Sequence, residues 1–127
     1  MTAPLLPPRI LVVDDNEDAA DSLVEVLGLL EHEARAAYGG RQALLVAREF
    51  LPRIVLLDLS MPDVDGFETL KLLRAEPGLA PLHVLAMTGH GAAEDIVRCH
   101  AAGFDEHLTK PVTIEHLMKV LDRLKAG

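Results

Sequence analysis

Four short apolar runs of the sequence each end at residues that could do chemistry. These residues are Asp14 with Asp15, Asp58, Thr88 and Lys110, after the runs at 10–13, 54–57, 82–87 and 104–108. A carboxylate can act as a nucleophile and form an aspartyl phosphate, and phosphoryl transfer otherwise needs mainly positioning and charge stabilisation. We therefore take Asp58 as the candidate phosphoryl acceptor, with the ammonium of Lys110 and the hydroxyl of Thr88 stabilising the incoming charge.

The three carboxylates of Asp14, Asp15 and Asp58 would repel one another if the ends of these runs meet in space. Each close pair costs about 1 kcal/mol at ~4 Å in water, and more where the dielectric constant is lower. A divalent cation would offset this cost. Hard oxygen ligands in small number, with room for water and a phosphate, favour Mg²⁺. With Lys110 and Mg²⁺ the charges of the site sum to zero, which leaves it ready for a phosphoryl group.

The spacing of apolar residues predicts the elements that bring these groups together. Buried strands are expected at 10–13, 54–57, 82–87 and 104–108 with a weaker one at 34–37, and helices at 17–30, 41–49, 67–75, 92–102 and 114–124. Because strands and helices alternate strictly, we expect an α/β fold with a doubly wound, five-stranded parallel sheet covered by helices on both faces. Ligands of such sheets bind at the carboxyl ends of the strands, where the candidate residues stand.

Local signals mark the ends of two expected helices. Gly103 stands where a left-handed residue would end the helix at 92–102, and Thr113 stands where an N-cap would begin the last helix. The last helix is expected to pack on the sheet through one apolar stripe: Ile114, Leu117, Met118, Leu121 and Leu124.

Composition narrows the class of protein. A chain of 127 residues is expected to form one domain, which we place at 9–127 after a flexible leader at 1–8. The net charge of −8 argues against a nucleic-acid surface. The single Cys99 fits a reducing compartment. The sequence contains neither a signal peptide nor an apolar run of the ~20 residues that a membrane span needs. A cytoplasmic protein without membrane contact is therefore expected.

Several segments together resemble the receiver domain of two-component response regulators, over nearly the whole chain. They are Ile10–Asp15, Asp58–Gly66, Met87–Gly89, Gly103–Asp105 and Leu108–Pro111. The resemblance implies a flavodoxin-like fold with strand order 2-1-3-4-5. It also implies a phosphoacceptor domain of a His-Asp phosphorelay, which is no enzyme except that it catalyses its own phosphorylation and dephosphorylation.

The resemblance assigns a role to each candidate residue. Asp58 takes the phosphoryl group from a phosphohistidine of a histidine kinase or histidine phosphotransferase. Mg²⁺ is bound by the carboxylates of Asp15 and Asp58, by Asp14 mostly through water, and by the backbone carbonyl of Ser60. Lys110 pairs with the phosphoryl oxygens, and Thr88 moves to donate a hydrogen bond to them. The peptide bond between Lys110 and its proline is expected to be cis.

The resemblance also implies how the signal leaves the site. A population shift changes the face formed by the helix at 92–102, the strand at 104–108 and the last helix. This face is a candidate surface for an output domain or a target protein, and a weak homodimer is a further candidate. His107 departs from the family pattern, which has Tyr or Phe there. Because histidine titrates near neutral pH, we hypothesise weaker or pH-sensitive coupling. His90 stands where members of the family tune the lifetime of the phosphoryl group.

Three other classes of protein fit the sequence less well. A phosphatase or mutase of the haloacid-dehalogenase type needs a second Asp two residues after the nucleophile, where this chain has Ser60, and a cap domain for which no room remains. A flavin-binding protein of similar topology needs a hydroxyl- and Gly-rich phosphate loop where Asp14 and Asp15 stand. A degenerate receiver that is never phosphorylated would lack the acidic set. Whether the domain acts alone or comes from a hybrid kinase or larger regulator stays open.

Overall fold

The computed structural model describes residues 8–59, 61, 65–79, 82–89 and 93–126. Ser60 and His90 lie outside these ranges, as do the predicted leader up to residue 7, the loop residues 62–64 and the first residue of the helix expected at 92–102. Within the described ranges, every predicted strand and helix is present.

The elements alternate strictly along the chain. They are β1 (Ile10–Val13), α1 (Glu17–Leu29), β2 (Ala34–Ala37), α2 (Gly40–Phe50), β3 (Ile54–Asp58), α3 (Gly66–Ala75), β4 (His83–Thr88), α4 (Ala93–Ala102), β5 (Glu106–Thr109) and α5 (Ile114–Ala126). The predicted ends differ by one or two residues. Two differences concern the site, because Asp58 and Thr88 are the last residues of their strands instead of the first residues after them. Among the described segments, no helix combines the length and apolar character that crossing a membrane requires.

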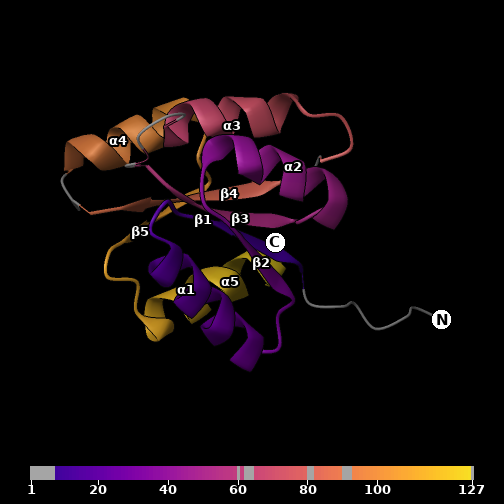
Figure 1. The fold of residues 1–127 in the computed structure, drawn as a ribbon. Coiled ribbons are helices and arrows are strands. Elements are labelled where there is room, and N and C mark those ends of the chain that lie inside the picture. Colours follow the sequence, from indigo (N-terminus) through magenta and orange to yellow (C-terminus); the bar gives the residue numbers. More distant parts are fainter. Residues whose placement is uncertain (1–7, 60, 62–64, 80–81, 90–92, 127) are drawn as a thin grey trace.

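All strand pairs of the sheet are parallel, in the order β2-β1-β3-β4-β5, as predicted. Helices α2, α3 and α4 cover one face, and α1 and α5 cover the other (Figure 1). The register sets Asp58 beside Met87 and Thr88 beside Thr109. The carboxyl ends of the four strands that carry the candidate residues are therefore aligned along one edge of the sheet.

The sheet separates two hydrophobic cores because successive strand residues point to opposite faces. The core under α2, α3 and α4 includes Leu11, Val13, Val55, Leu57, Leu70, Leu73 and Phe104. The core under α1 and α5 includes Ile10, Val12, Leu56, Met87, Leu108, Leu117 and Leu121. Burial on both faces explains why β1, β3 and β4 read as continuous apolar runs instead of alternating ones.

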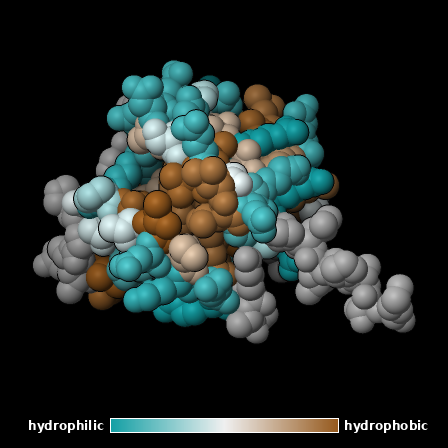
Figure 2. Space-filling view, turned by 90° about the horizontal axis from the view of Figure 1, so that it is seen from below, coloured by the Kyte–Doolittle hydropathy of each residue, from teal (hydrophilic) through white to brown (hydrophobic). Residues whose placement is uncertain are grey.

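The predicted apolar stripe of α5 was wrong at two positions. Ile114 and Met118 are 52% and 45% exposed, whereas Leu117, Val120 and Leu121 are buried against the sheet. Val120, on the other flank of the stripe, takes part in the core and turns the buried side of the helix away from Ile114 and Met118. Figure 2, which views the α1–α5 side, shows an apolar area surrounded by hydrophilic residues.

Two helix ends follow the predicted local chemistry, and the structure adds a third cap at the start of α1. The Oγ1 of Thr113 accepts a hydrogen bond from the backbone N–H of His116 over 3.2 Å, so the predicted N-cap of α5 is confirmed. Gly103 follows α4 with φ of +105°, a left-handed conformation that glycine adopts without strain. The side chain of Asn16 caps α1 by accepting from the N–H of Ala19 over 3.1 Å. Asn16 thereby fixes where α1 begins, directly after Asp14 and Asp15.

Candidate functional site

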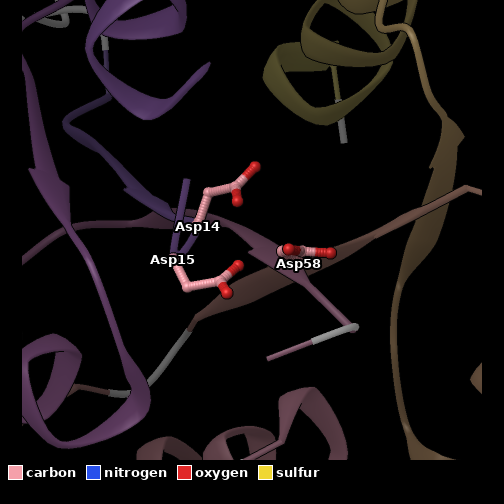
Figure 3. A group of neighbouring side chains, drawn as sticks. All are labelled: Asp14, Asp15 and Asp58. Atoms are coloured by element: carbon pink, nitrogen blue, oxygen red, sulfur yellow. The ribbon is translucent and has the colours of Figure 1, made fainter. Parts of the chain in front are cut away.

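Three carboxylates meet at the carboxyl edge of the sheet. Asp14 and Asp15 follow β1, and Asp58 is the last residue of β3, the strand next to it. One carboxylate oxygen from each residue lies within 4.8 Å of the others. Figure 3 shows the three side chains gathered at the ends of these two strands. The structure therefore brings together the acidic residues that the sequence singled out.

The ammonium of Lys110 lies between two of these carboxylates. Its Nζ donates to Oδ2 of Asp14 over 2.9 Å and is 3.4 Å from Oδ2 of Asp58. Burial would lower the pKa of Lys110, but the hydrogen bond to Asp14 and the charges of Asp58 and Asp14 outweigh that effect, so its pKa is raised. The side chain therefore carries a fixed positive charge at the site at neutral pH.

The three carboxylates differ in their exposure. Asp14 and Asp58 are each only 3% exposed, whereas Asp15 is exposed. Asp14 is held by Lys110 and by the backbone N–H of Asn16, which donates to its Oδ1 over 3.0 Å. One side of the site is thus fixed by internal hydrogen bonds, and the side of Asp15 opens to solvent.

Thr88 is the last residue of β4, the strand that lies between β3, which ends at Asp58, and β5, which Lys110 follows. Thr88 is 6% exposed. Its backbone carbonyl accepts the N–H of Lys110 over 2.7 Å, which carries the pairing of β4 and β5 one residue past Thr109. The peptide bond between Lys110 and Pro111 is cis, as the resemblance implied. Strand pairing therefore aligns Thr88 and Lys110 at the same edge as the carboxylates.

Gly66, the first residue of α3, has a role that sequence reasoning missed. A Cβ on this residue would lie 2.7 Å from Cα of Leu59 and 2.8 Å from the carbonyl oxygen of Asp58. Only glycine fits this approach of α3 to the backbone of the acceptor. The sequence does place this glycine directly before a predicted helix. A glycine at such a position can indicate that another part of the backbone approaches closely.

His107 is a half-buried residue of β5, paired in register with Ala86. Ser60 and His90, by contrast, lie outside the described residues, so their predicted roles stay predictions.

The carboxylates of Asp14, Asp15 and Asp58 fit a magnesium ion. Three carboxylates and one ammonium leave a net charge of −2 within a site that is partly buried. Carboxylate oxygens in small number, open to solvent on one side, suit a cation that keeps part of its water shell. The side chains therefore form a site with the charge and the ligand type that Mg²⁺ prefers.

Comparison with known proteins identifies the family. The family model described as "Response regulator receiver domain" matches residues 10–122. The chain belongs to this family, which makes it a signalling domain of two-component systems and a phosphoacceptor by class. Receiver domains of this kind act with histidine kinases, bind Mg²⁺ at an acidic cluster and are often attached to output domains.

Curated relatives include full-length regulators and a kinase. The chain is 32% identical to "DNA-binding dual master transcriptional regulator RpaA" of Synechocystis sp. over 87% of this chain and 46% of that protein. It is 37% identical to "Transcriptional regulatory protein PrrA" of Mycobacterium tuberculosis over 87% of this chain and 47% of the relative. It is 38% identical to "Sensor histidine kinase RcsC" of Salmonella typhi over 88% of this chain and 12% of the kinase. The chain thus spans less than half the length of these relatives.

Solved structures confirm the fold. The chemotaxis protein CheY4 of Vibrio cholerae has a TM-score of 0.85 at 28% identity, covering 91% of this chain and 97% of that one. A putative response regulator of Chloroflexus aurantiacus has a TM-score of 0.86 at 29% identity, covering 95% and 99%.

Proposed function

We propose that Asp58 accepts a phosphoryl group from a phosphohistidine of a histidine kinase or histidine phosphotransferase. The observation that carries this proposal is the convergence of Asp14, Asp15 and Asp58 within 4.8 Å, with the ammonium of Lys110 against two of them. A nucleophilic carboxylate, a fixed cation and an open acidic side are the parts that phosphoryl transfer to an aspartate needs.

The transfer is a displacement at phosphorus. A carboxylate oxygen of Asp58 forms the new bond to phosphorus while the bond from phosphorus to the donor imidazole nitrogen breaks, and the electron pair of that bond stays on the nitrogen. The ammonium of Lys110 leaves its present partner on Asp58 and pairs with a phosphoryl oxygen. The hydroxyl of Thr88 donates to another phosphoryl oxygen after the group is attached. These two contacts stabilise charge where it develops.

The metal ligands in this proposal are the carboxylates of Asp15 and Asp58, Asp14 mostly through water, and the backbone carbonyl of Ser60. When bound, Mg²⁺ supplies the positive charge that lets a phosphoryl group approach three carboxylates. The exposed side chain of Asp15 gives the ion an entry from solvent. Asp14 keeps its hydrogen bond to Lys110, which fits a residue that binds the ion through a water molecule.

The same site supports removal of the phosphoryl group. An acyl phosphate in an open acidic site is accessible to water, so the protein would return to the unphosphorylated state by hydrolysis. The domain then catalyses only its own phosphorylation and dephosphorylation. The outcome that matters for signalling is the change in its conformation.

The surface formed by α4, β5 and α5 is the proposed exit of the signal, toward an output domain, a target protein or a weakly bound second copy. Val97 on α4 is 66% exposed, an apolar side chain available to a partner. His107 at the centre of β5 is the proposed cause of weaker or pH-sensitive coupling to this surface.

Beryllofluoride, a mimic of the phosphoryl group, tests the proposal. In the presence of Mg²⁺ it should shift the amide resonances around Asp58, Thr88 and Lys110 in the wild-type protein and leave the Asp58→Asn variant unchanged. An Asp18→Asn variant, which removes an acidic residue outside the cluster, should respond like wild type. Equal shifts in wild type and Asp58→Asn would contradict the proposed acceptor.

A further inference from the structure

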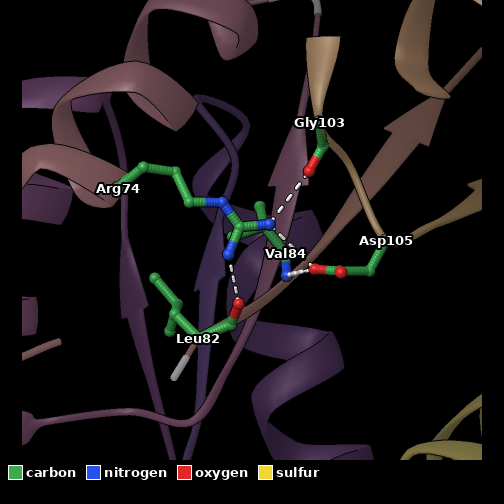
Figure 4. A network of polar contacts seen from close by, with 5 residues as sticks. All are labelled: Arg74, Leu82, Val84, Gly103 and Asp105. Atoms are coloured by element: carbon green, nitrogen blue, oxygen red, sulfur yellow. Dashed lines mark hydrogen bonds and ion pairs between the residues drawn. The ribbon is translucent and has the colours of Figure 1, made fainter. Parts of the chain in front are cut away.

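Arg74, near the C-terminal end of α3, binds the chain between α4 and β5. Its Nη2 donates to the carbonyl of Gly103 and to Oδ2 of Asp105, each over 2.9 Å (Figure 4). Its Nη1 donates to the carbonyl of Leu82, directly before β4. The same oxygen of Asp105 accepts the backbone N–H of Val84 over 2.8 Å. A single guanidinium therefore ties α3 both to β4 and to the chain that enters β5.

Two helical turns earlier, Phe67 contacts the same chain segment from the same face of α3. Its ring packs edge-to-face against Phe104 with the centroids 5.8 Å apart. The guanidinium carbon of Arg98, on α4, lies over the Phe67 ring at 4.9 Å from its centroid. Phe104 is buried at 3% exposure, so this contact belongs to the core and is not a loose surface pair. Both ends of α3 thus hold the junction of α4 and β5.

The start of α3 is in turn pressed against the acceptor. The N–H of Gly66 points to the carbonyl of Leu59 at 3.5 Å, and a methyl group on Gly66 would overlap the carbonyl oxygen of Asp58. The side chain of Asp65 caps the helix by accepting the N–H of Glu68 over 2.9 Å, which fixes the first turn. Because Gly66 already contacts the backbone of Asp58 and Leu59, a displacement of that backbone moves α3 directly.

We infer that α3 acts as a rigid link that carries a change at Asp58 to the junction of α4 and β5, with Phe67 and Arg74 as positioning residues. This inference rests on the proposed phosphorylation of Asp58 and names a route of regulation for that same site. A packed helix moves as a body, and densely packed interfaces pass a shift on instead of absorbing it. The directional hydrogen bonds of Arg74 make the junction follow α3.

The type of side chain matters at this position. The planar fork of arginine reaches the carbonyls of Leu82 and Gly103 and the carboxylate of Asp105 at the same time. A lysine would keep the charge but could not hold these acceptors in one fixed geometry. Arg74→Lys therefore separates the loss of the fork from the loss of the charge, and Arg74→Met removes both while it keeps the apolar stem.

The test compares amide shifts caused by beryllofluoride with Mg²⁺ in wild type, Arg74→Lys, Arg74→Met, Phe67→Leu and a control. The control is Arg48→Met, which removes a similar exposed pair, Arg48 with Glu76 at 2.7 Å, away from the α4–β5 junction. All should shift near Asp58. The shifts over Glu106–Thr109 should fall by at least about twofold in Arg74→Met and Phe67→Leu, partly in Arg74→Lys, and not in the control. Shifts of wild-type size in Arg74→Met and Phe67→Leu would overturn the link.

A second measurement does not depend on phosphorylation. The Gly66→Ala substitution pushes on the carbonyl of Asp58 from the side of α3, so it should shift the amides of Glu106–Thr109 without any phosphoryl mimic. The double variant Gly66→Ala with Arg74→Met, compared with Arg74→Met alone, should not show this remote shift. If the shift persists in the double variant, or is absent from Gly66→Ala itself, the link is wrong. If wild type ignores beryllofluoride while this pair behaves as expected, the link stands and the phosphoacceptor role of Asp58 fails.

Discussion

The Nζ of Lys110 lies 2.9 Å from Oδ2 of Asp14, although 96 positions separate the two residues in the sequence. The pair spans the ends of β1 and β5, which are not neighbours in the sheet. The lysine therefore reaches across the ends of β3 and β4 and passes Asp58, whose Oδ2 is 3.4 Å away. One ammonium thus pairs with two buried carboxylates, and Asp15 adds a third carboxylate, so the site carries excess negative charge.

Removing Lys110 should destabilise the metal-free protein. In Lys110→Met, the carboxylates of Asp14 and Asp58 keep their burial but lose their cation, and breaking such a pair costs roughly 1–3 kcal/mol where it is partly open to water. Urea unfolding in the presence of a chelator measures this loss. Added Mg²⁺ should restore more stability to the variant than to wild type, because the variant has greater excess negative charge. Lys119→Met, an exposed change on α5, should leave the free energy of unfolding nearly unchanged.

The pH dependence of this ion pair has a defined sign. Because the pKa of Lys110 is raised above its ordinary value of 10.5, the stabilisation is fully present below that value and is lost as the pH rises through the raised pKa. Above the ordinary lysine range, wild type should therefore lose stability more steeply than Lys110→Met. Parallel unfolding curves of the two proteins through this alkaline range would show that the lysine does not pair with the carboxylates in solution.

Asp15→Asn should separate metal binding from folding. The exposed carboxylate of Asp15 is a proposed ligand of Mg²⁺ but not a partner of Lys110. Its removal should weaken Mg²⁺ binding at least about tenfold and raise the stability of the metal-free protein slightly, because one repulsion of about 1 kcal/mol or less is relieved. A magnesium titration and urea unfolding test the two effects, with Glu25→Gln on α1 as the control. Unchanged magnesium affinity would remove Asp15 from the ligand set.

Gly66→Ala and Gly28→Ala should have opposite effects on stability. A Cβ at Gly66 would meet backbone atoms at 2.7 and 2.8 Å, whereas one at Gly28 would meet nothing within 4 Å. The first change should cost about 1–3 kcal/mol and slow the phosphorylation of Asp58. The second should stabilise α1 by up to about 1 kcal/mol, because alanine favours the helix interior. Thermal unfolding measures both, and an unaltered melting temperature for Gly66→Ala would mean that α3 does not pack this tightly.

His107 should weaken the coupling of the site to β5. Its ring is smaller than the Tyr or Phe that the family has at this position, so the response of β5 to beryllofluoride should be smaller in wild type than in His107→Tyr. The control His83→Gln should respond like wild type. Amide shifts over β5 measure the response. A His107→Tyr protein that responds like wild type would refute the hypothesis.

The order of the elements could be predicted because the central strands are buried on both faces and read as uninterrupted apolar runs. Asp14, Asp58 and Lys110 could be selected because parallel strands bring their carboxyl ends to one edge. The buried side of α5 could not be selected, since Val120 and Met118 are both apolar and only packing decides between them. The contacts of Arg74 with Gly103 and Asp105, 29 and 31 positions away, likewise depend on tertiary distances that no local pattern encodes.

The central claim, phosphorylation of Asp58, is tested most directly by mass spectrometry of the protein incubated with acetyl phosphate and Mg²⁺. Wild type should gain the mass of one phosphoryl group, and peptide mapping should place it on the segment that holds Asp58. The gain should be lost with a chelator of Mg²⁺ and in Asp58→Asn, and retained in Asp18→Asn. A wild-type protein that gains no mass, or an Asp58→Asn variant that gains it equally, would contradict the account.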